Sequence, residues 1–378
     1  MEALTGRNWW SLIRGIDIVE IRSKLNGSEI VGIDLFSGAG GMSLGAELAG
    51  VSVKYAIEKD KYAAETYQAN HKNTIMINQD ICEIDTNIFD LEDGCCILFG
   101  GAPCQGFSTS NRRTNNRNNP QNWLYLEFIR FLEKIRPEWF VFENVTGLVE
   151  LESGCFFEGI LNDFEKKGYK CSYAILNAAD FGVPQKRSRL FIVGSKSGIE
   201  VDLLPKKTEK IVTVKEAFQD LPLLHNGANI DVMPYACDAT NEYSKCMRGN
   251  LKKCTGNLVS RNAPYVVDRY KYVKQGENWT AIPENLMKNY ADLSKCHTGI
   301  YYRLLENRPS VVIGNYRKNM LIHPYQNRGL SVREAARLQS FPDTYTFKGS
   351  IGYQQQQVGN AVPPLLAKHV FKTIINNI

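Results

Sequence analysis

The chain has 378 residues, of which 43% are hydrophobic and 22% are charged, the composition of an ordinary soluble globular protein. The formal net charge of +5 permits a polyanionic partner without demanding one. The ten cysteines include no CxxC pair, which excludes a zinc knuckle or a thioredoxin-like motif, and we expect no bound metal. Residues 1–14 lack a long apolar segment, and no apolar run reaches membrane-spanning length. We therefore expect no signal peptide, no membrane association and a cytoplasmic location.

From Glu29 onward, short apolar runs alternate with segments of helical periodicity. The strand candidates are 30–36, 53–57, 76–77, 95–99, 139–142, 171–176 and 190–193. The helix candidates between them are 44–48, 62–69, 124–135 and 157–167. Strands that alternate with helices predict the α/β class, with a doubly wound, Rossmann-like sheet.

The regions outside this alternation have a different character. Residues 1–29 form an extension, either an arm that touches DNA or, as we favour, a helix packed on the main domain. Residues 222–300 are rich in Asn, Lys, Tyr and Cys and show little periodicity, which indicates a separate irregular module. Ser331 and Glu334 have capping-box spacing and predict a helix through Leu338. Pro363 and Pro364 open a final helix that should end near residue 375.

A glycine-rich turn follows the first strand candidate, in the run Asp34-Leu-Phe-Ser-Gly-Ala-Gly-Gly. Glycines let the backbone turn sharply and let a ligand approach closely, although a turn alone is weak evidence. Glu58 ends the second strand, where an acid suits ribose hydroxyls. Asp80 could accept a hydrogen bond from an adenine amino group, and Phe36 could stack on the ring. The third glycine of a dinucleotide fingerprint is replaced by Ser43, so the pattern favours a nucleoside over NAD.

A second loop at a strand end carries a candidate nucleophile. The run Gly100-Gly-Ala-Pro-Cys-Gln-Gly-Phe-Ser holds Cys104 between proline and glutamine, a setting that favours attack over packing in the interior. Glu143 ends another strand, and the run from Gln185 to Arg189 directly precedes one. The same rim of a sheet can bring Cys104, Glu143 and Arg189 together. A thiolate that attacks, an acid near a ring nitrogen and a guanidinium on a carbonyl oxygen form a coherent catalytic set.

Six runs, taken in order, resemble the signature of one enzyme family. They are DLFSGAGG from Asp34, PCQGFS from Pro103, ENV from Glu143, QKRSR from Gln185, REAARLQSFPD from Arg333 and QVGNAVPP from Gln357. This series resembles the DNA (cytosine-5) methyltransferases, in particular those of bacterial restriction-modification systems. The resemblance runs from about Val31 to the C-terminus and leaves out residues 1–29 and 222–300.

The resemblance implies S-adenosylmethionine as cofactor and assigns roles to the matching residues. Cys104 would attack C6 of a cytosine turned out of the duplex, so that C5 can take the methyl group. Glu143 would hold N3 and the amino group, Arg189 would bind O2, and Arg187 would orient the acid and its loop. The implied cofactor-binding residues are Phe36, Ser37, Gly38, Gly40, Gly41, Glu58, Asp80, Ile81, Pro103, Leu124, Asn360, Ala361 and Val362. Lys59 departs from the family pattern, because relatives often carry an apolar residue there beside the adenine.

The resemblance also implies a division of the chain into domains. Residues 30–204, completed by 352–378, would form the catalytic domain, and 205–351 a smaller target recognition domain with a return helix. Residues 109–122 are polar and follow the nucleophile loop, so we favour a mobile lid on the DNA backbone over a plain surface loop. The residues expected to contact DNA are Gln105, Ser108, Ser110, Arg112, Arg113, Arg261, Thr298 and Arg303.

The expected function is sequence-specific methylation of cytosine in double-stranded DNA by a monomer, which would protect host DNA from a cognate restriction endonuclease. An RNA cytosine-5 methyltransferase is one alternative, but the long module after Pro222 offers the extra surface that major-groove reading requires. A non-catalytic DNA-binding homologue is another, disfavoured because Cys104, Glu143 and Arg189 are all present. A nicotinamide oxidoreductase is disfavoured by Ser43 and by the Pro-Cys-Gln loop.

Overall fold

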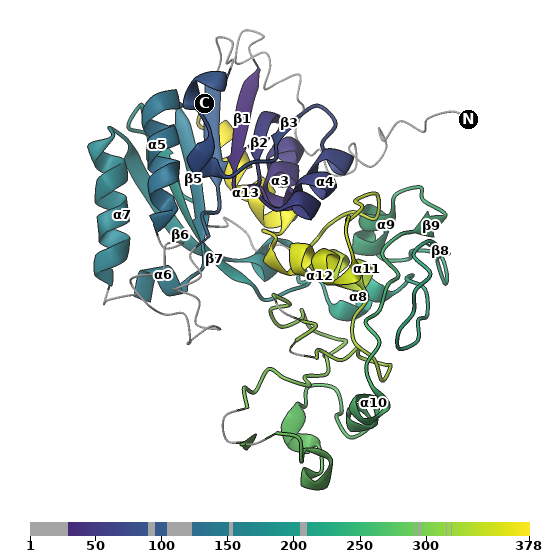
Figure 1. Cartoon of the computed structure of the whole chain (residues 1–378). Helices are drawn as coiled ribbons and strands as arrows, with labels where there is room; N and C mark the ends of the chain where they lie inside the picture. Colours follow the sequence, from purple (N-terminus) through teal and green to yellow (C-terminus); the bar gives the residue numbers. More distant parts are fainter. Residues whose placement is uncertain are drawn as a thin grey trace. The chain divides into compact units, whose positions relative to one another are not determined.

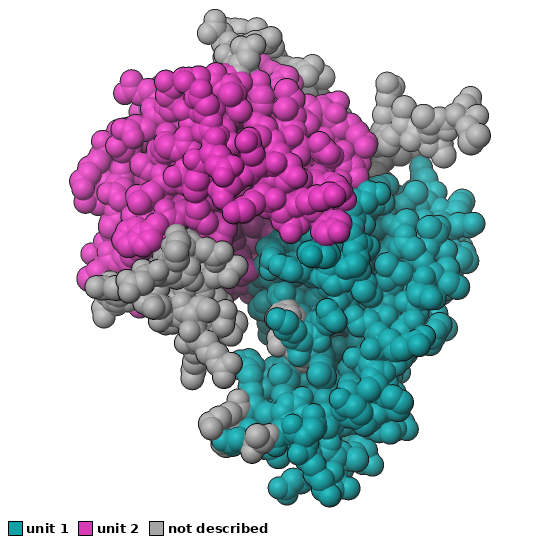
Figure 2. All heavy atoms as spheres, in the orientation of Figure 1, with its two compact units in different colours: residues 1–13, 182–187, 209–361 teal, residues 14–181, 188–208, 362–378 magenta. Residues whose placement is uncertain are grey.

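The computed structural model describes residues 29–89, 95–103, 123–150, 154–204, 210–290, 292–293, 296–314, 316–318 and 320–378. These residues divide into two compact units, shown in different colours in Figure 2. Among them, unit 1 contains residues 182–187 and those within 210–361, and unit 2 contains the residues up to Phe181 together with 188–204 and 362–378. The expected N-terminal extension lies outside the described residues, apart from Glu29.

Unit 2 is built on a seven-stranded sheet with the order β3-β2-β1-β4-β5-β7-β6 (Figure 1). The strands are β1 (Ile30–Leu35), β2 (Ser52–Ile57), β3 (Ile75–Ile77), β4 (Cys95–Gly100), β5 (Trp139–Asn144), β6 (Lys170–Asn177) and β7 (Ser188–Ser195). Strands β1 to β5 pair in parallel, whereas β7 runs antiparallel to both β5 and β6. The α/β class and the doubly wound sheet are therefore confirmed, with an antiparallel β7 that the sequence did not predict.

Helices lie between the strands of unit 2 along the chain, and α13 follows the last strand. They are α3 (Gly41–Ala49), α4 (Lys61–Asn70), η1 (Ile81–Glu83), η2 (Thr86–Ile88), α5 (Tyr125–Ile135), α6 (Gly147–Glu150), α7 (Cys155–Lys166), η6 (Ala178–Phe181) and α13 (Pro364–Ile375). Every residue of β1 and β5 is buried, which explains why most of their residues are apolar and do not alternate with polar ones. Phe128 of α5 and Phe164 of α7 pack on the aromatic rings of β5, which belong to Phe140 and Phe142. These residues lie in the core that supports the sheet.

The last helix of the chain packs in unit 2, beside its seven-stranded sheet. Helix α13 packs along α3, the helix that follows the glycine turn. The two backbones approach closely at Gly45, where an added Cβ would lie 2.4 Å from the Cβ of Ala367. The rings of Phe99 on β4 and Phe371 on α13 meet edge to face at 4.9 Å. The last helix of the chain is therefore part of the same core as the helix that follows the glycine turn.

Unit 1 consists of short elements joined by long irregular segments. They are α8 (Val214–Phe218), β8 (Met233–Pro234), α9 (Glu242–Arg248), β9 (Lys253–Cys254), α10 (Pro264–Tyr270), η7 (Trp279–Ala281), η8 (Glu284–Leu286), α11 (Val332–Leu338) and α12 (Ile351–Asn360). The expected capping box is confirmed, because Ser331 and Glu334 hydrogen-bond reciprocally at the start of α11. Among the described residues of both units, no helix is long and apolar enough to cross a membrane. The same residues contain no cluster of three metal-binding side chains.

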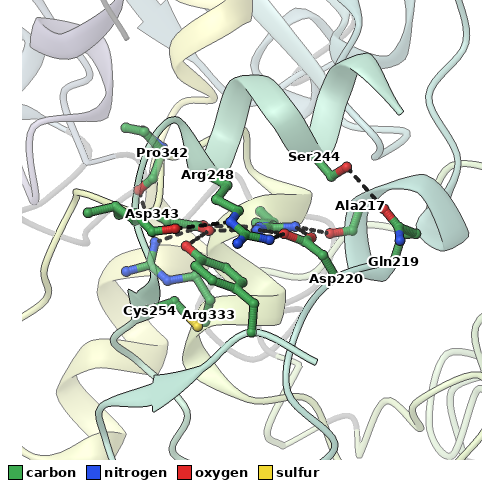
Figure 3. A network of polar contacts seen from close by, with 12 residues as sticks. Ala217, Gln219, Asp220, Ser244, Arg248, Cys254, Arg333, Pro342 and Asp343 are labelled. Carbon is green, nitrogen blue, oxygen red and sulfur yellow. Dashed lines mark hydrogen bonds and ion pairs between the residues drawn. The ribbon is translucent and has the colours of Figure 1, made fainter. Parts of the chain in front are cut away.

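A buried ionic network organises unit 1 around α11 (Figure 3). Arg337 forms ion pairs with Asp220 and with Asp343, and all three side chains are inaccessible to solvent. Arg248 of α9 lies 3.5 Å from Asp220, and Arg333 lies 3.7 Å from Asp343. Buried charges are stable only when they are paired and hydrogen-bonded, so this network fixes α11 against α8 and α9.

Candidate active site

The glycine turn after β1 is built from left-handed backbone. Phe36, Gly38 and Gly40 have φ angles of 58°, 55° and 88°. Glycine adopts this region freely, whereas Phe36 is a non-glycine residue held there by the surrounding structure. The Ser37 amide donates to the Ile57 carbonyl at 2.9 Å, which ties the turn to the end of β2. No described atom lies within 4 Å of a Cβ placed on Gly38, so the turn leaves open space at this glycine.

Glu58 supports the turn from the end of β2. Its Oε2 accepts the Gly38 amide at 2.8 Å, and its Oε1 accepts the Asp60 amide at 2.7 Å. Burial raises the pKa of Glu58, and the hydrogen bonds from the two amides partly oppose this rise. Each carboxylate oxygen can accept more than one hydrogen bond, so Glu58 keeps acceptor capacity for a hydroxyl-bearing ligand.

Asp80 is paired in a way that the sequence did not reveal. The Lys59 ammonium lies 2.5 Å from its Oδ2, and the Cys82 amide donates to its Oδ1 at 3.1 Å. The hydrogen bond from Lys59 is the main reason that the pKa of Asp80 lies below its ordinary value. The Asn78 side chain bonds the carbonyls of Glu58 and Lys59 and so joins the ends of β2 and β3. The lysine noted as a departure from the family pattern therefore contacts one of the expected ligand-binding acids.

A buried chain of hydrogen bonds joins three elements around the turn. The Ser43 hydroxyl donates to Asp34 at 2.6 Å, and the Tyr67 hydroxyl donates to Ser43 at 2.7 Å. Burial raises the pKa of Asp34 well above its ordinary value. In the sequence Ser43 stood out only as a missing third glycine. Its hydroxyl in fact links β1, α3 and α4, which keeps the turn in one arrangement.

The backbone that leads to Cys104 leaves the sheet next to Glu143. Gly100 must be glycine, because an added Cβ would lie 2.2 Å from the Leu35 carbonyl oxygen. A Cβ on Gly101 would lie 2.7 Å from Oε2 of Glu143. The Asn144 side chain donates to the Ala102 carbonyl at 3.2 Å. The end of β5 therefore holds the backbone that leads to Pro103, the last described residue before Cys104.

Glu143 and Arg189 form an ion pair at this rim. Arg189 Nε lies 2.9 Å from Glu143 Oε1, and both side chains are largely buried. The antiparallel pairing of β5 with β7 brings the end of one strand beside the start of the other. Burial lowers the pKa of Arg189, and the carboxylate of Glu143 opposes that effect. The structure thus brings together two of the three residues that sequence reasoning placed at one rim.

Four other expected site residues lie at the end of α12, next to it in the chain or in contact with it. Arg187 is buried in unit 1, and its Nη2 donates to the Asn360 carbonyl at 3.3 Å. Asn360 and Ala361 end α12 in unit 1, whereas Val362 begins the last segment of unit 2. The remaining cofactor candidates lie in unit 2, with Ile81 buried at the start of η1 and Leu124 just before α5.

The structure describes only three of the residues that were expected to contact DNA. Cys104 and the residues Gln105, Ser108, Ser110, Arg112 and Arg113 lie outside the described residues, as does the expected lid. Arg261 and Thr298 are exposed in unit 1. The expectation for Arg303 is corrected, because its side chain is buried and donates to the carbonyls of Tyr270, Val273, His323 and Gln326 and to the Asn327 side chain. A guanidinium committed to these acceptors stabilises the module and is not presented to DNA.

Comparison with known proteins agrees with this arrangement. The family model of C-5 cytosine-specific DNA methylases matches residues 30–376. The Type II methyltransferase M.DdeI of Desulfomicrobium norvegicum is 35% identical over 90% of this chain and 88% of its own length. M1.HphI of Haemophilus parahaemolyticus, also a Type II methyltransferase, is 36% identical over 91% of this chain and 86% of its own length. A prophage-encoded E. coli protein, named as a candidate DNA modification methyltransferase, superposes with a TM-score of 0.74 at 27% identity, covering 92% of this chain and 99% of that one. The chain therefore belongs to the family of C-5 cytosine-specific DNA methylases and is a DNA (cytosine-5) methyltransferase.

Proposed function

We propose that the chain transfers a methyl group from S-adenosylmethionine to C5 of a cytosine flipped out of duplex DNA, through a covalent bond between Cys104 and C6. The Glu143–Arg189 ion pair carries this proposal. It lies at the end of β5, directly against Gly101 of the loop that leads to Cys104. An acid and a guanidinium held together beside a cysteine loop offer both a group for the ring nitrogen and amino edge and a group for the carbonyl oxygen of cytosine.

The glycine turn fits S-adenosylmethionine. Open space at Gly38 gives a backbone cradle for the methionine portion, and Glu58 at the end of β2 offers a carboxylate to the ribose hydroxyls. Asp80 offers an acceptor to the adenine amino group, although Lys59 shares its Oδ2. When bound, the cofactor supplies an electrophilic methyl group on a sulfonium centre. The other residues proposed to line its site are Phe36, Ser37, Gly40, Gly41, Ile81, Pro103, Leu124, Asn360, Ala361 and Val362.

The residues of the chain activate the cytosine by covalent addition, and a later elimination restores the ring. The Cys104 thiolate forms a bond to C6, and the electron pair of the C5=C6 double bond makes C5 nucleophilic. Glu143 holds N3 and the amino group, and Arg189 holds O2, so the charge that develops on the ring is stabilised. Methyl transfer to C5 would break the bond between sulfur and methyl and leave the cofactor as a neutral thioether, and a base then removes the C5 proton. The electron pair re-forms the C5=C6 bond as the sulfur of Cys104 leaves.

The substrate proposed is double-stranded DNA rather than RNA. Both reported relatives are Type II methyltransferases, and unit 1 gives this chain the large irregular surface that base reading requires. We propose that residues 205–351 form the target recognition domain and residues 30–204 with 352–378 the catalytic domain. A cognate restriction endonuclease, a cytoplasmic location and a monomeric state complete the proposal.

Methyl transfer tests the proposed function directly. The purified protein, incubated with tritium-labelled S-adenosylmethionine, should label duplex DNA and should leave transfer RNA unlabelled. Bisulfite sequencing of DNA from cells that express the protein should then show one methylated sequence context. Glu143→Gln should abolish labelling, whereas Glu150→Gln on the exposed end of α6 should not. Labelling of transfer RNA in place of DNA, or none in either, would overturn the proposal.

A further inference from the structure

Two buried glutamines connect distant segments of unit 1. Gln185 and Gln339 are both fully buried. Gln185 Nε2 donates to Gln339 Oε1 at 2.8 Å and to the Leu338 carbonyl at 3.2 Å. Gln185 Oε1 accepts the Ile313 amide at 3.0 Å. Gln339 Nε2 donates to the carbonyls of Val358 at 2.7 Å and Ala361 at 3.3 Å. We call this pair of side chains the amide relay.

The amide relay ends on the C-terminus of α12. The last carbonyls of a helix have no partner within the helix, and that end carries a partial negative charge. Gln339 Nε2 donates to the carbonyl of Val358, and Arg187 Nη2 donates to the carbonyl of Asn360 at 3.3 Å. An amide and a guanidinium from other segments thus cap α12. The guanidinium has the charge that this helix end favours.

Backbone contacts also hold residues 184–187 and the end of α12. The Lys186 amide donates to the Ser310 carbonyl, and the Ser310 amide donates to the Pro184 carbonyl, both at 2.9 Å. Gly359 lies so close to Gly314 that an added Cβ would be 2.1 Å from the Gly314 carbonyl oxygen. Residues 310–314 therefore support the segment 184–187 on one side and the end of α12 on the other.

Both segments lie where the chain leaves unit 1. Residues 182–187 precede Ser188, and residues up to Ala361 precede Val362, each the first residue of a segment of unit 2. We propose that Gln339 is a positioning residue for methyl transfer. Through the amide relay it holds the segment that ends at Arg187, two residues before Arg189, and the end of α12 at Asn360 and Ala361 in one arrangement. This inference rests on the proposed function, which assigns the first segment to the cytosine and the second to the cofactor.

The chemistry of the relay requires glutamine at residue 339. The side chain accepts a hydrogen bond through Oε1 and donates two through Nε2. A glutamate could accept from Gln185, but its carboxylate would face the carbonyl oxygens of Val358 and Ala361 without a donor. A methionine has similar volume but neither group, so Gln339→Met removes the relay with little change in packing.

The experiment measures cofactor binding without DNA by calorimetry and kcat in a DNA methylation assay. Gln339→Met should weaken S-adenosylmethionine binding by about tenfold and lower kcat by a similar factor, as expected for the loss of buried hydrogen bonds. Gln185→Met should act in the same direction, and the double variant should be no worse than Gln339→Met alone, because both changes break one relay. Gln355→Met is the matched control. Gln355 is a buried glutamine of α12 that bonds Ser260, so its loss should lower Tm and leave binding and kcat unchanged.

The possible results separate the relay from the function on which it rests. Failure of the wild-type protein to bind S-adenosylmethionine would overturn the proposed function itself. If the wild type binds, but Gln339→Met lowers Tm as Gln355→Met does while Kd and kcat stay at the wild-type values, Gln339 is merely structural and the inference is wrong. Should Gln339→Met not fold, Gln185→Met decides the question in the same two assays.

Discussion

Replacing Arg337 by methionine should destabilise unit 1 strongly, because it leaves two buried carboxylates short of a partner. Arg337 hydrogen-bonds Asp220, Asp343 and the carbonyl of Ala217. Burial opposes ionisation of Asp343, but the Arg337 guanidinium overcomes this and holds the pKa of that carboxyl below its ordinary value. Methionine fills much of the space and supplies no charge.

The remaining contacts set the expected size of the effect. Asp220 keeps Arg248 at 3.5 Å, and Asp343 keeps Arg333 at 3.7 Å and the Tyr235 hydroxyl at 2.7 Å. Removing one partner of a buried ion pair costs about 3–5 kcal/mol of unfolding free energy. The contacts that survive place Arg337→Met near the lower end, at about 3 kcal/mol. Adding Asp343→Asn should cost less than the sum of the single effects, because the same network is already broken.

Urea unfolding measures the change, and hydrogen exchange in peptides from α8, α9 and α11 assigns it to unit 1. Arg317→Met is the control, because Arg317 is exposed in the same unit and its loss should change stability by no more than about 0.5 kcal/mol. If Arg337→Met costs no more than this control, the network does not stabilise unit 1 and the reasoning fails.

Three further predictions concern the cofactor, pH and specificity. Glu58→Ala should weaken S-adenosylmethionine binding by about 1–3 kcal/mol in calorimetry, as expected for lost charge-assisted hydrogen bonds, and unchanged binding would contradict its role. Burial lowers the pKa of His323 to about 4, so the unfolded chain binds a proton below pH 6.5 that the folded chain does not. Stability should therefore fall by up to about 3 kcal/mol as pH drops from 6.5 to 4, and His323→Asn, read by urea unfolding at each pH, should flatten that slope. Exchanging residues 222–300 for those of a related enzyme should redirect methylation in bisulfite sequencing, and an active chimaera that kept the original target would refute this division of labour.

The sequence predicted the sheet where local patterns decide the structure. Strands β1 and β5 are buried throughout, so their mostly apolar residues could be recognised as strands, and glycines marked the turns after β1 and β4. The antiparallel placement of β7 between β5 and β6 was not predictable in this way. The direction and partner of a strand depend on contacts with distant segments of the chain. A short apolar run does not indicate which segments these are.

The candidate site shows the same limit. Glu143 and Arg189 could be placed at one rim because both lie at strand ends, and they are in contact. Gln185 and Gln339 are 154 residues apart and gain their roles only from tertiary contacts, so sequence reasoning gave neither of them a structural role. Arg303 was misassigned to DNA, because an arginine in an irregular segment has the same local sequence whether it binds phosphate or carbonyls in the interior.

Covalent trapping tests the central claim that Cys104 is the nucleophile. Duplex DNA in which 5-fluorocytosine replaces cytosine cannot lose the C5 substituent as a proton, so the bond between Cys104 and C6 should persist. Wild-type protein with S-adenosylmethionine should form an adduct that survives denaturation, and so should the control Cys155→Ala, which changes an exposed cysteine of α7. Cys104→Ala should form none and should not methylate ordinary DNA. Near-normal methylation by Cys104→Ala would contradict the account.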